Sequence, residues 1–489
     1  MAGIVSYGAY IPWHRLNRQT ILWSMGWFNP AVALPGRKAV AGYDEDSITM
    51  AVEAARDCLK GFPEEKVDAV YFATTTAPFK ERQNAVVVAA ALDLKEDLRA
   101  ADFTDSPRAG TAALLAGCEA VAAAGAGSLL VTAADARLGK MGSAQEQIFG
   151  DGAAAFLIGR ENVVAELKGF YSLSADFADH RRTQKDTFDR SWEERWVREA
   201  GYAQFVPRAI TGLLRKYGLS PGDFAKVVYT CPYAREHAAI AKKLGLPPEK
   251  IQDSLMGEVG DTGAAYALMM LAAALEEARP GDKILVAGYG SGCDALYFEV
   301  TEEILKRKDR KGVRGHLTPF ADLGSYEKYA VFKNIIPLEV GIRGEETAPT
   351  QLSTLFRERR TVLGLVGGRC RLCGTPQFPA QRVCVNPQCG EIDQMEDYRF
   401  ADLEGRLFTY TADRLAASVN PPAIYGLVDF AGGGRYLFDL TDCEPDALKV
   451  GMPVRMSFRR KYTDETRGIY GYFWKAVPVR EEGQDGGRD

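Results

Sequence analysis

The chain has 489 residues, a net charge of −5 and 26% charged residues, a composition typical of a soluble globular protein of roughly two to four domains. No apolar run reaches the roughly 18 residues that a membrane-spanning helix needs. The N-terminal residues go straight into a strand-like run with no signal-peptide pattern. An isoelectric point near 5.7 gives no basic footprint for nucleic acid. We therefore expect a cytoplasmic protein with neither a nucleic-acid nor a membrane partner.

The first two thirds of the chain predict a duplicated α/β body. Short β-rich runs alternate with helical segments rich in Ala and Leu, which favours a layered α/β fold. Residues 109–135 match residues 264–290 without a gap, and each stretch predicts a nearly apolar helix followed by a buried strand. A helix that is apolar on all sides belongs in a core. We expect two similar halves, 1–165 and 166–335, packed face to face; two unrelated α/β domains are the alternative.

Five runs in this body carry a more specific likeness: GIVSYGAYIP (3–12), DEDSITMAVEAARDCL (44–59), AGTAAL (109–114), FGDGAAAFLIG (149–159) and ILVAGYGSGCDA (284–295). Together they resemble the 3-hydroxy-3-methylglutaryl-CoA synthase branch of the thiolase superfamily. The resemblance implies a duplicated five-layered α-β-α-β-α fold, an acyl-CoA substrate that brings coenzyme A with it, and a homodimer.

The resemblance also assigns the family's catalytic residues to positions at which this chain differs. The family's cysteine falls on Pro107, its histidine on Thr230 and its glutamate near Thr75, and the asparagine of the related ketoacyl synthases falls on Asp261. Without the cysteine there is no thiolate to take up the acyl group. Proline also lacks the backbone N–H that the cysteine position contributes to an oxyanion hole. A shift of one residue would place Ser106 at the nucleophile position, but without a histidine beside it.

The same loop also has a purely structural interpretation. Asp105 or Ser106 is a favoured residue before a helix, and Pro107 would then occupy the first helical position, where its missing N–H costs nothing. A helix start of this kind is built for stability rather than for nucleophilic attack.

The remaining candidates for catalysis are Asp261 and, more weakly, Tyr233. A partly buried carboxyl at position 261 could act as a general acid or base, although capping of a helix that begins near Thr262 explains it equally well. Tyr233 falls beside the position of the lost histidine, where a phenol could donate to a carbonyl or could simply pack. Cys231 and Cys293 lie in the same region and are interpreted as small buried side chains.

Two further elements are candidates for substrate binding. The resemblance places Gly290, Ser291 and Gly292 in a pocket hairpin whose backbone N–H groups could hold a thioester oxygen, since glycine permits close approach. A tight turn between two core strands is the alternative. Arg235 resembles an arginine that could meet the phosphates of CoA, and a solvated helix face is the other interpretation.

The cysteines of the C-terminal part predict a metal site. Cys370, Cys373, Cys384 and Cys389 form a C-x2-C pair and a C-x4-C pair, which is zinc-ribbon spacing. Four thiolates fill a tetrahedral zinc ion and leave no open position, so we expect a structural zinc rather than a catalytic one.

The C-terminal part as a whole predicts a linker, the ribbon and a small antiparallel barrel. Alternating strands with glycine-rich turns follow the cysteines. We divide this part into a linker (336–354), a zinc ribbon (355–395), an OB-fold (396–480) and a disordered tail (481–489). It resembles the ribbon and OB-fold domain that accompanies thiolase-like proteins, which implies that it covers the acyl-CoA entrance or holds subunits together.

Three functions remain open at this point. The first is an enzyme that makes or breaks a C–C bond next to an acyl-CoA thioester, by aldol or retro-aldol chemistry, without an acyl-cysteine. The second is a conventional synthase of the Claisen condensing type. The third is a non-catalytic subunit that binds acyl-CoA or supports a further thiolase-like subunit.

Overall fold

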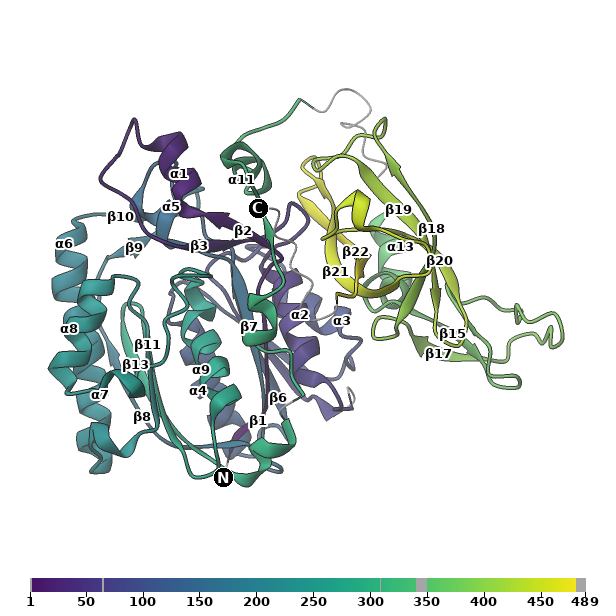
Figure 1. Ribbon diagram of the computed structural model, residues 1–489. Helices are drawn as coiled ribbons and strands as arrows, with labels where there is room; N and C mark the ends of the chain where they lie inside the picture. The colour runs from purple at the N-terminus through teal and green to yellow at the C-terminus, as the bar shows by residue number, and fades with distance from the viewer. Residues whose placement is uncertain (1, 64–65, 308, 340–349, 481–489) are drawn as a thin grey trace.

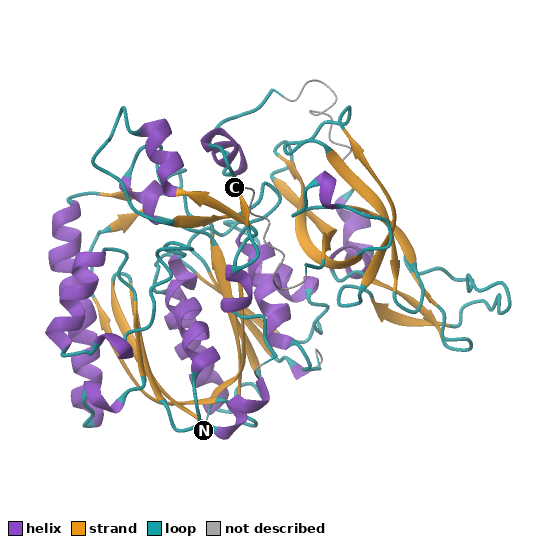
Figure 2. Ribbon diagram, viewed as in Figure 1, coloured by secondary structure: helices purple, strands orange, loops and turns teal. Residues whose placement is uncertain are grey.

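The computed structural model describes residues 2–63, 66–307, 309–339 and 350–480. Helices and strands of the body form layers, and the C-terminal module lies to one side of them (Figures 1 and 2). Within the described residues, no helix is both long enough and apolar enough to cross a bilayer. The predicted tail 481–489 lies outside the described residues, as does most of the predicted linker.

The body is built on two half-sheets that meet edge to edge. In the described residues they form one sheet with the strand order β11-β12-β13-β8-β1-β7-β6-β4-β5, and β1 pairs with β8 through only two residue pairs. The first half-sheet contains β1 (Gly3–Tyr10), β4 (Ala69–Ala73), β5 (Arg99–Phe103), β6 (Leu129–Asp135) and β7 (Gly152–Gly159). The second contains β8 (Ala165–Ser174), β11 (Lys226–Tyr229), β12 (Lys283–Tyr289) and β13 (Gly292–Val300).

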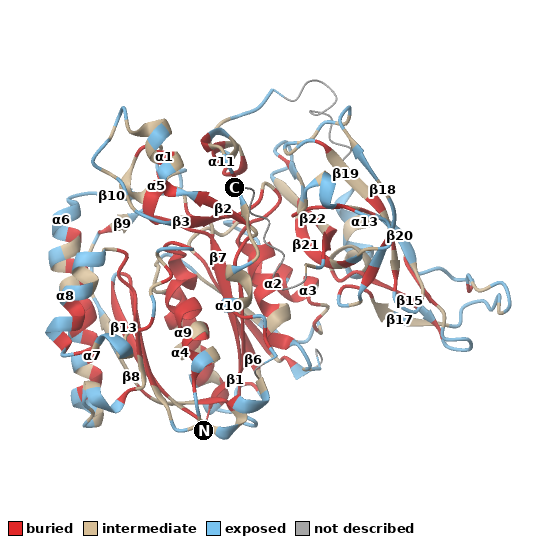
Figure 3. Cartoon of the chain, in the orientation of Figure 1, coloured by how far each residue is buried: buried red, intermediate tan, exposed pale blue. Residues whose placement is uncertain are grey.

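Helices separate and cover the half-sheets, giving the expected five layers. Two nearly apolar helices, α4 (Ala109–Ala122) and α9 (Tyr266–Glu277), lie in the middle layer and are largely buried (Figure 3). They approach closely at Gly110, where a Cβ atom would lie 2.1 Å from the carbonyl oxygen of Ala264. The outer layers contain α2 (Ser47–Leu59) and α3 (Asn84–Ala91) on one side, and α7 (Ala203–Tyr217) and α8 (Ala234–Leu244) on the other. The predicted duplicated fold is confirmed.

The two halves of the duplication are not equally complete. In the first half β5 pairs with β4 over five residues. Its counterpart in the second half is a single bridge between Val227 and Ile251. The edge of the second half-sheet is therefore shorter than that of the first.

The start of α4 differs from the expected capping pattern. The helix begins at Ala109, and Arg108 precedes it without a side-chain cap. The N–H of Ala109 donates to the carbonyl of Ser106, while the hydroxyl of Ser106 accepts from the N–H of Arg108 at 3.2 Å. Pro107 thus lies in a tight turn before the helix and not at its first residue.

Short elements cover the end of the body at which the site lies. They are β2 (His14–Asn17), α1 (Arg18–Met25), β3 (Arg37–Val40), α5 (Ala144–Ile148), β9 (His180–Arg181), β10 (Arg190–Ser191), α6 (Glu194–Trp196), β14 (Ala321–Asp322) and α11 (Tyr326–Phe332). The short helix α10 (Arg314–Leu317) packs against the end of β1, where the ring of His316 contacts that of Tyr10.

The C-terminal module consists of two short helices, a ribbon and a barrel. The helices are α13 (Leu352–Arg357) and α14 (Arg359–Leu363), and the ribbon sheet contains β15 (Val366–Cys370), β16 (Pro376–Gln377) and β17 (Met395–Arg399). The barrel strands are β18 (Gly405–Asp413), β19 (Ala423–Phe430), β20 (Arg435–Asp439), β21 (Pro453–Asp464) and β22 (Ile469–Pro478). They run antiparallel in the order β20-β19-β18-β21-β22, and a bridge from Leu440 to Ala476 links the two ends. The predicted barrel is confirmed.

A buried ionic cluster joins the module to the body. The guanidinium of Arg459, on β21, is fully buried and faces the carboxylates of Asp44, Glu45 and Asp442, with its Nη1 2.6 Å from Glu45 Oε1. Lys475 adds an ion pair with Asp44 at 2.8 Å. Two of these carboxylates belong to the body, so the interface cluster (Asp44, Glu45, Asp442, Arg459, Lys475) ties the two parts together.

Candidate functional site

The candidate site is a cavity at the carboxyl ends of three neighbouring parallel strands. β4 pairs in parallel with both β5 and β6, and ligands of α/β sheets commonly bind at such ends. The cavity has a volume of about 670 Å³ and is lined by residues from the segments 74–80, 102–107 and 180–184, with Asn84, Arg137 and Asp189. This volume lies within the range of about 300–1,000 Å³ that is usual for small-molecule sites.

The loop before α4, to which the resemblance assigns the family's cysteine, lies at this cavity. Ser106 and Pro107 are half-buried, and both line it. The hairpin between β12 and β13 packs directly on this loop, because a Cβ atom on Gly290 would lie 2.4 Å from the hydroxyl oxygen of Ser106. The structure therefore brings two sequence-predicted elements, Ser106 and the glycine turn, into contact.

The glycine turn is largely occupied by its own hydrogen bonds. The N–H of Gly290 donates to the carbonyl of Gly292, and the carbonyl of Ser291 accepts from the N–H of Ala175. Ser291 has a φ of +45° and is exposed. Of the described residues that line the cavity, none comes from this turn. The N–H of Gly290 is thus committed to the hairpin in this structure.

Asp135, at the end of β6, organises the loop that contains the family's glutamate position. Its buried carboxylate accepts hydrogen bonds from the N–H groups of Thr75 and Thr76 and from the three hydroxyls of Thr74–Thr76. It also accepts from the N–H of Ala264 in the other half at 2.7 Å. Burial raises the pKa of Asp135, and these hydrogen bonds oppose the rise. Thr75, in the place of the glutamate, is part of this loop support.

Two arginines and two carboxylates form a second cluster at the cavity. Arg137 Nε donates to Asp189 at 2.8 Å, and its Nη1 lies 3.6 Å from Asp261. Arg182 shares Asp189 at 3.0 Å. Burial alone would lower the pKa of Arg137, but Asp189 and Asp261 outweigh it and raise that pKa. We call Arg137, Arg182, Asp189 and Asp261 the cavity cluster.

Asp261 lies behind Arg137 rather than at the cavity wall. Its side chain is 7% exposed, and its Oδ1 accepts from the N–H of Gly263, the first residue of a short 3₁₀ helix. Thr262 is the residue before this helix, so Asp261 holds the turn ahead of it and is not its capping residue. Arg137 lines the cavity and Asp261 does not, so the carboxylate of Asp261 contacts the cavity wall through Arg137.

The region of the lost histidine is filled by packing. The hydroxyl of Thr230 accepts from the N–H of Tyr289, which ties the end of β11 to β12. Tyr233 precedes α8 and contacts the ring of Tyr202, which stacks on Tyr289 with centroids 4.0 Å apart. Arg235 is exposed on α8. Tyr233 does not line the cavity, and the rings of Tyr202 and Tyr289 connect it to Asp179 beside the cavity.

A histidine that the motifs did not single out does line the cavity. His180 Nδ1 lies 3.2 Å from Asp179 Oδ2, and the backbone N–H of His180 donates to Asp179 Oδ1 at 2.7 Å. The hydroxyl of Tyr289 donates to the same carboxylate. Burial would raise the pKa of Asp179, but His180 and Tyr289 outweigh it and lower that pKa. In the sequence, the only indication of this pair is that Asp179 and His180 are adjacent. The sequence does not show that the fold brings them to the cavity.

The cysteines near this region are not poised as nucleophiles. Cys231 and Cys293 are both buried, and burial raises the pKa of the Cys231 thiol to about 12 and that of Cys293 further still. A thiol with such a pKa is almost entirely protonated at neutral pH. Among the described residues that line the cavity there is no cysteine.

The four ribbon cysteines converge as a metal site requires. Their sulfur atoms all lie within 4.8 Å of one another, with Cys370 and Cys389 at 3.8 Å and Cys373 and Cys384 at 3.5 Å. Zn–S bonds of about 2.3 Å in a tetrahedron place sulfur atoms about 3.8 Å apart. The residues present therefore fit zinc, in a site with four protein ligands and a structural role.

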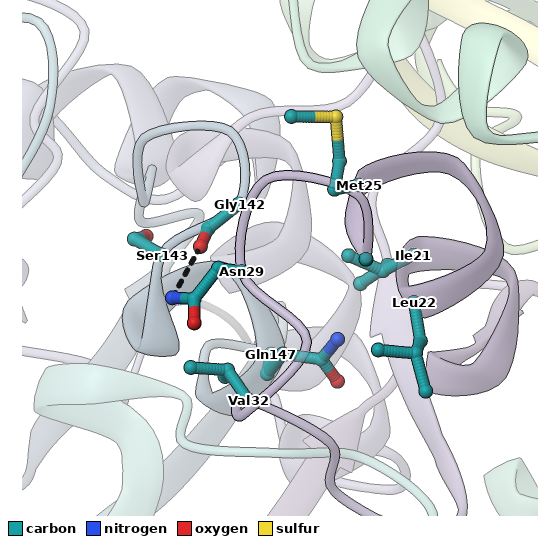
Figure 4. A pocket seen from close by; sticks show the side chains of 9 residues that line it. Ile21, Leu22, Met25, Asn29, Val32, Gly142, Ser143 and Gln147 are labelled. Carbon is teal, nitrogen blue, oxygen red and sulfur yellow. Dashed lines mark hydrogen bonds between the residues drawn. The ribbon is translucent and has the colours of Figure 1, made fainter.

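Other hollows in the described residues lie away from Ser106, and two of them bear on the fold. A cleft of about 790 Å³ lies between the barrel and the body, lined by Tyr43 and Phe332 on one side and by Tyr425 and Arg460 on the other. A hollow beneath α1, shown in Figure 4 with the bond from Asn29 to the carbonyl of Gly142, measures only about 10 Å³. The second is too small for more than about one water molecule.

Comparison with known proteins identifies the family of the body. The hydroxymethylglutaryl-CoA synthase of Pyrococcus furiosus is 34% identical over 61% of this chain and 85% of its own length. That of Methanopyrus kandleri is 33% identical over 68% of this chain and 97% of its own length. The chain belongs to the hydroxymethylglutaryl-CoA synthase family. The assignment of the family's catalytic positions to Pro107, Thr230 and Thr75 stays a prediction.

Solved structures and domain models agree with this family. An HMG-CoA synthase complexed with CoA matches with a TM-score of 0.62 over 72% of this chain and 94% of its own, at 19% identity. The model of the C-terminal part of 3-oxoacyl-[acyl-carrier-protein] synthase III matches residues 214–297. Models of the ChsH2 rubredoxin-like zinc ribbon and of the ChsH2 C-terminal OB-fold match residues 357–393 and 398–459. This HMG-CoA synthase homologue therefore carries both predicted C-terminal domains in one chain.

Proposed function

We propose that this protein acts on acyl-CoA thioesters and makes or cleaves a C–C bond next to the thioester, by an aldol or retro-aldol step without an acyl-cysteine. The observation that carries the proposal is the cavity lined by Ser106 and Pro107, the loop to which the resemblance assigns the family's cysteine. The family membership supports the substrate class, and the cavity is large enough for an acyl group.

The absence of a thiolate at the described cavity wall favours aldol over Claisen chemistry. A Claisen synthase first transfers an acyl group to a nucleophile, and an unassisted serine is far weaker than a thiolate. An aldol step needs only a stabilised enolate and a group that moves a proton. The polar lining of the cavity supplies candidates for both.

Arg137 is the best-placed group to stabilise a thioester enolate oxygen. It lines the cavity, its side chain is only 3% exposed, and it is held between Asp189 and Asp261. A fixed positive charge aimed at developing negative charge is usually a large term in catalysis. In this arrangement Asp261 positions Arg137. Direct proton transfer by Asp261 or Tyr233 stays a prediction, as does CoA phosphate binding by Arg235.

The proposal is tested by turnover and by intact mass. Purified protein is incubated with 3-hydroxyacyl-CoA substrates, and aldehyde or ketone release is measured together with the acyl-CoA product. We expect retro-aldol cleavage and no covalent adduct. The mass of the protein would increase by one acyl group if Ser106 acted as a synthase nucleophile, and that result would contradict the proposal.

The same experiment separates the third function from the first. Binding of CoA, measured by calorimetry, without turnover of any acyl-CoA would favour the non-catalytic subunit. The predicted homodimer and a further thiolase-like subunit remain predictions, to be measured by light scattering of the pure protein and of co-purified complexes.

A further inference from the structure

His180 combines three properties that the other histidines of the chain do not share. It lines the cavity together with Ser106 and Pro107. Its side chain is 10% exposed, and its Nδ1 faces the buried carboxylate of Asp179. By contrast, His237 stacks on Tyr229, His14 packs against Phe332, and His316 packs against Tyr10.

Asp179 is buried and is held in place by two hydrogen bonds. It is 3% exposed, it accepts from the backbone N–H of His180, and it accepts from the hydroxyl of Tyr289. Tyr289 is fixed in turn by the ring of Tyr202 and by the hydrogen bond from its backbone N–H to the hydroxyl of Thr230. The 3.2 Å contact of Asp179 with Nδ1 of His180 is an ion-pair distance without hydrogen-bond geometry, so the charge of Asp179 favours a proton on Nδ1 without fixing the ring. A proton on Nδ1 leaves the lone pair of Nε2 free to act as a base.

We propose that His180, with its Nδ1 facing Asp179, is the group that removes and returns the proton in this cavity. The assignment rests on the proposed acyl-CoA function and names its proton carrier. It also explains how a chain with Thr230 in place of the family's histidine could still move protons, because the base comes from β9 rather than from the end of β11.

The step balances as follows. Nε2 of His180 takes a proton from the α-carbon of the thioester, and the C–H electron pair forms the C=C bond of the enolate. The thioester C=O pair moves to oxygen, where Arg137 faces it. The enolate carbon then bonds to the carbonyl carbon of the second substrate, whose oxygen takes the proton from the imidazolium. Cleavage of a 3-hydroxyacyl-CoA runs through the same transfers in reverse.

Exchange of the α-protons with solvent deuterium tests this base separately from C–C chemistry. Acetyl-CoA, propionyl-CoA and 3-hydroxybutyryl-CoA are incubated with the full-length protein in D2O, and label in the acyl group is followed by mass spectrometry. We expect exchange with the wild-type protein. His180→Gln should slow it by about 10²-fold or more, the usual contribution of a general base.

His237→Gln is the matched control, because it makes the same change at a histidine outside the cavity. Exchange should stay at the wild-type rate in this variant. Asp179→Asn should slow exchange by about 10-fold or more while the dissociation constant for CoA stays unchanged, which a general loss of folding would not produce. Thermal unfolding of all three variants verifies their stability.

The outcomes distinguish the two proposals. Exchange that persists at the wild-type rate in His180→Gln overturns the assignment of His180 and leaves the acyl-CoA function standing. No exchange in the wild-type protein, with any of the three thioesters, overturns the acyl-CoA function and the base together. Equal loss in His180→Gln and His237→Gln also overturns the assignment, since the effect would not be specific to the cavity.

Discussion

The cavity cluster and the interface cluster use the same kinds of side chain for different ends. In the interface cluster the guanidinium of Arg459 is fully buried, and its partners come from both the body and the module. In the cavity cluster Arg137 and Arg182 share Asp189 and line a space of about 670 Å³. Buried charges that are fully enclosed can only hold parts together. Charges beside a cavity can also act on what enters it.

This difference implies that variants in the two clusters should have separate effects. Changes in the module should affect stability and leave the chemistry of the cavity in the body intact. Changes in the cavity cluster should affect turnover and leave the zinc ribbon intact. The following predictions are ordered by the expected size of their effects.

Zinc removal should have the largest effect, and it should be confined to the module. The pure protein should contain about one zinc per chain, because four thiolates complete a tetrahedral site. Chelation should unfold the ribbon, since binding energy at such sites is folding energy. Metal analysis and proteolysis within 355–395 measure this. Iron in place of zinc, or a ribbon that resists proteolysis after chelation, would contradict the prediction.

Arg459→Met should weaken the attachment of the module by about 3–5 kcal/mol, because it leaves buried carboxylates without their cation. Chemical denaturation measures the loss. Arg435→Met is the control, since Arg435 pairs with Asp429 on the exposed face of the barrel and should change stability little. Equal stability of the two variants would show that the interface cluster does not hold the module.

Acid should weaken the same interface below about pH 4.5. The folded pKa values of Asp44 and Glu53 are both lowered to about 2, although burial alone would raise them. For Asp44 the charges of Lys475 and Arg459 outweigh burial. For Glu53 the charges of Arg56 and Arg455 do so. A carboxyl group whose pKa is lower in the folded than in the unfolded state stabilises the fold at every pH above its unfolded pKa. This stabilisation is on the order of 2 kcal/mol per group, and it is lost as the pH falls through the folded pKa.

Glu45 has the opposite sign, and this sets the window of that experiment. Burial raises its pKa to about 7, although its carboxylate lies 2.6 Å from Arg459 Nη1. Because the folded pKa of Glu45 is raised, its contribution to stability is complete below about pH 4.5 and is lost as the pH rises through 7. Denaturation between pH 4.5 and 2 therefore excludes the contribution of Glu45, while other carboxylates with lowered pKa, such as Asp179 and Asp402, still contribute. Glu53→Gln should flatten the pH dependence; an unchanged slope would contradict its role.

Asp261→Asn should act on the cavity alone. It keeps the shape but removes one of the two carboxylates that position Arg137, so turnover should fall about 10²-fold, the cost of misplacing a catalytic group by about 1 Å. Zinc content and unfolding should match the wild-type protein. Full activity in this variant would remove Asp261 from the mechanism, and a lost fold would make it a structural residue only.

Local patterns predicted the fold and the ribbon well. The apolar helices that became α4 and α9 could be placed in the core because neither has a polar face. The spacing of Cys370, Cys373, Cys384 and Cys389 sufficed for the ribbon, because ligands of one ion lie close in sequence. In both examples a short segment contains the whole signal.

The candidate site depended instead on contacts between distant segments. Asp179 and Tyr289 are 110 residues apart, and only the folded chain brings them together beside His180. Arg459 shows the same limit, because strand alternation sets its face but not whether the body covers that face. The consequence of Pro107 could be predicted from the sequence alone, because the missing N–H is a property of proline itself and needs no contact with a distant segment.

The most direct test of the account is the intact mass of the wild-type protein during turnover of an acyl-CoA in D2O. Deuterium uptake into the acyl group shows that the enolate forms, and the protein mass recorded at the same time shows whether an acyl-enzyme accumulates. We expect deuterium uptake with an unchanged protein mass. An acyl adduct on Ser106, Cys231 or Cys293, or binding of the thioester without any uptake, would contradict the account.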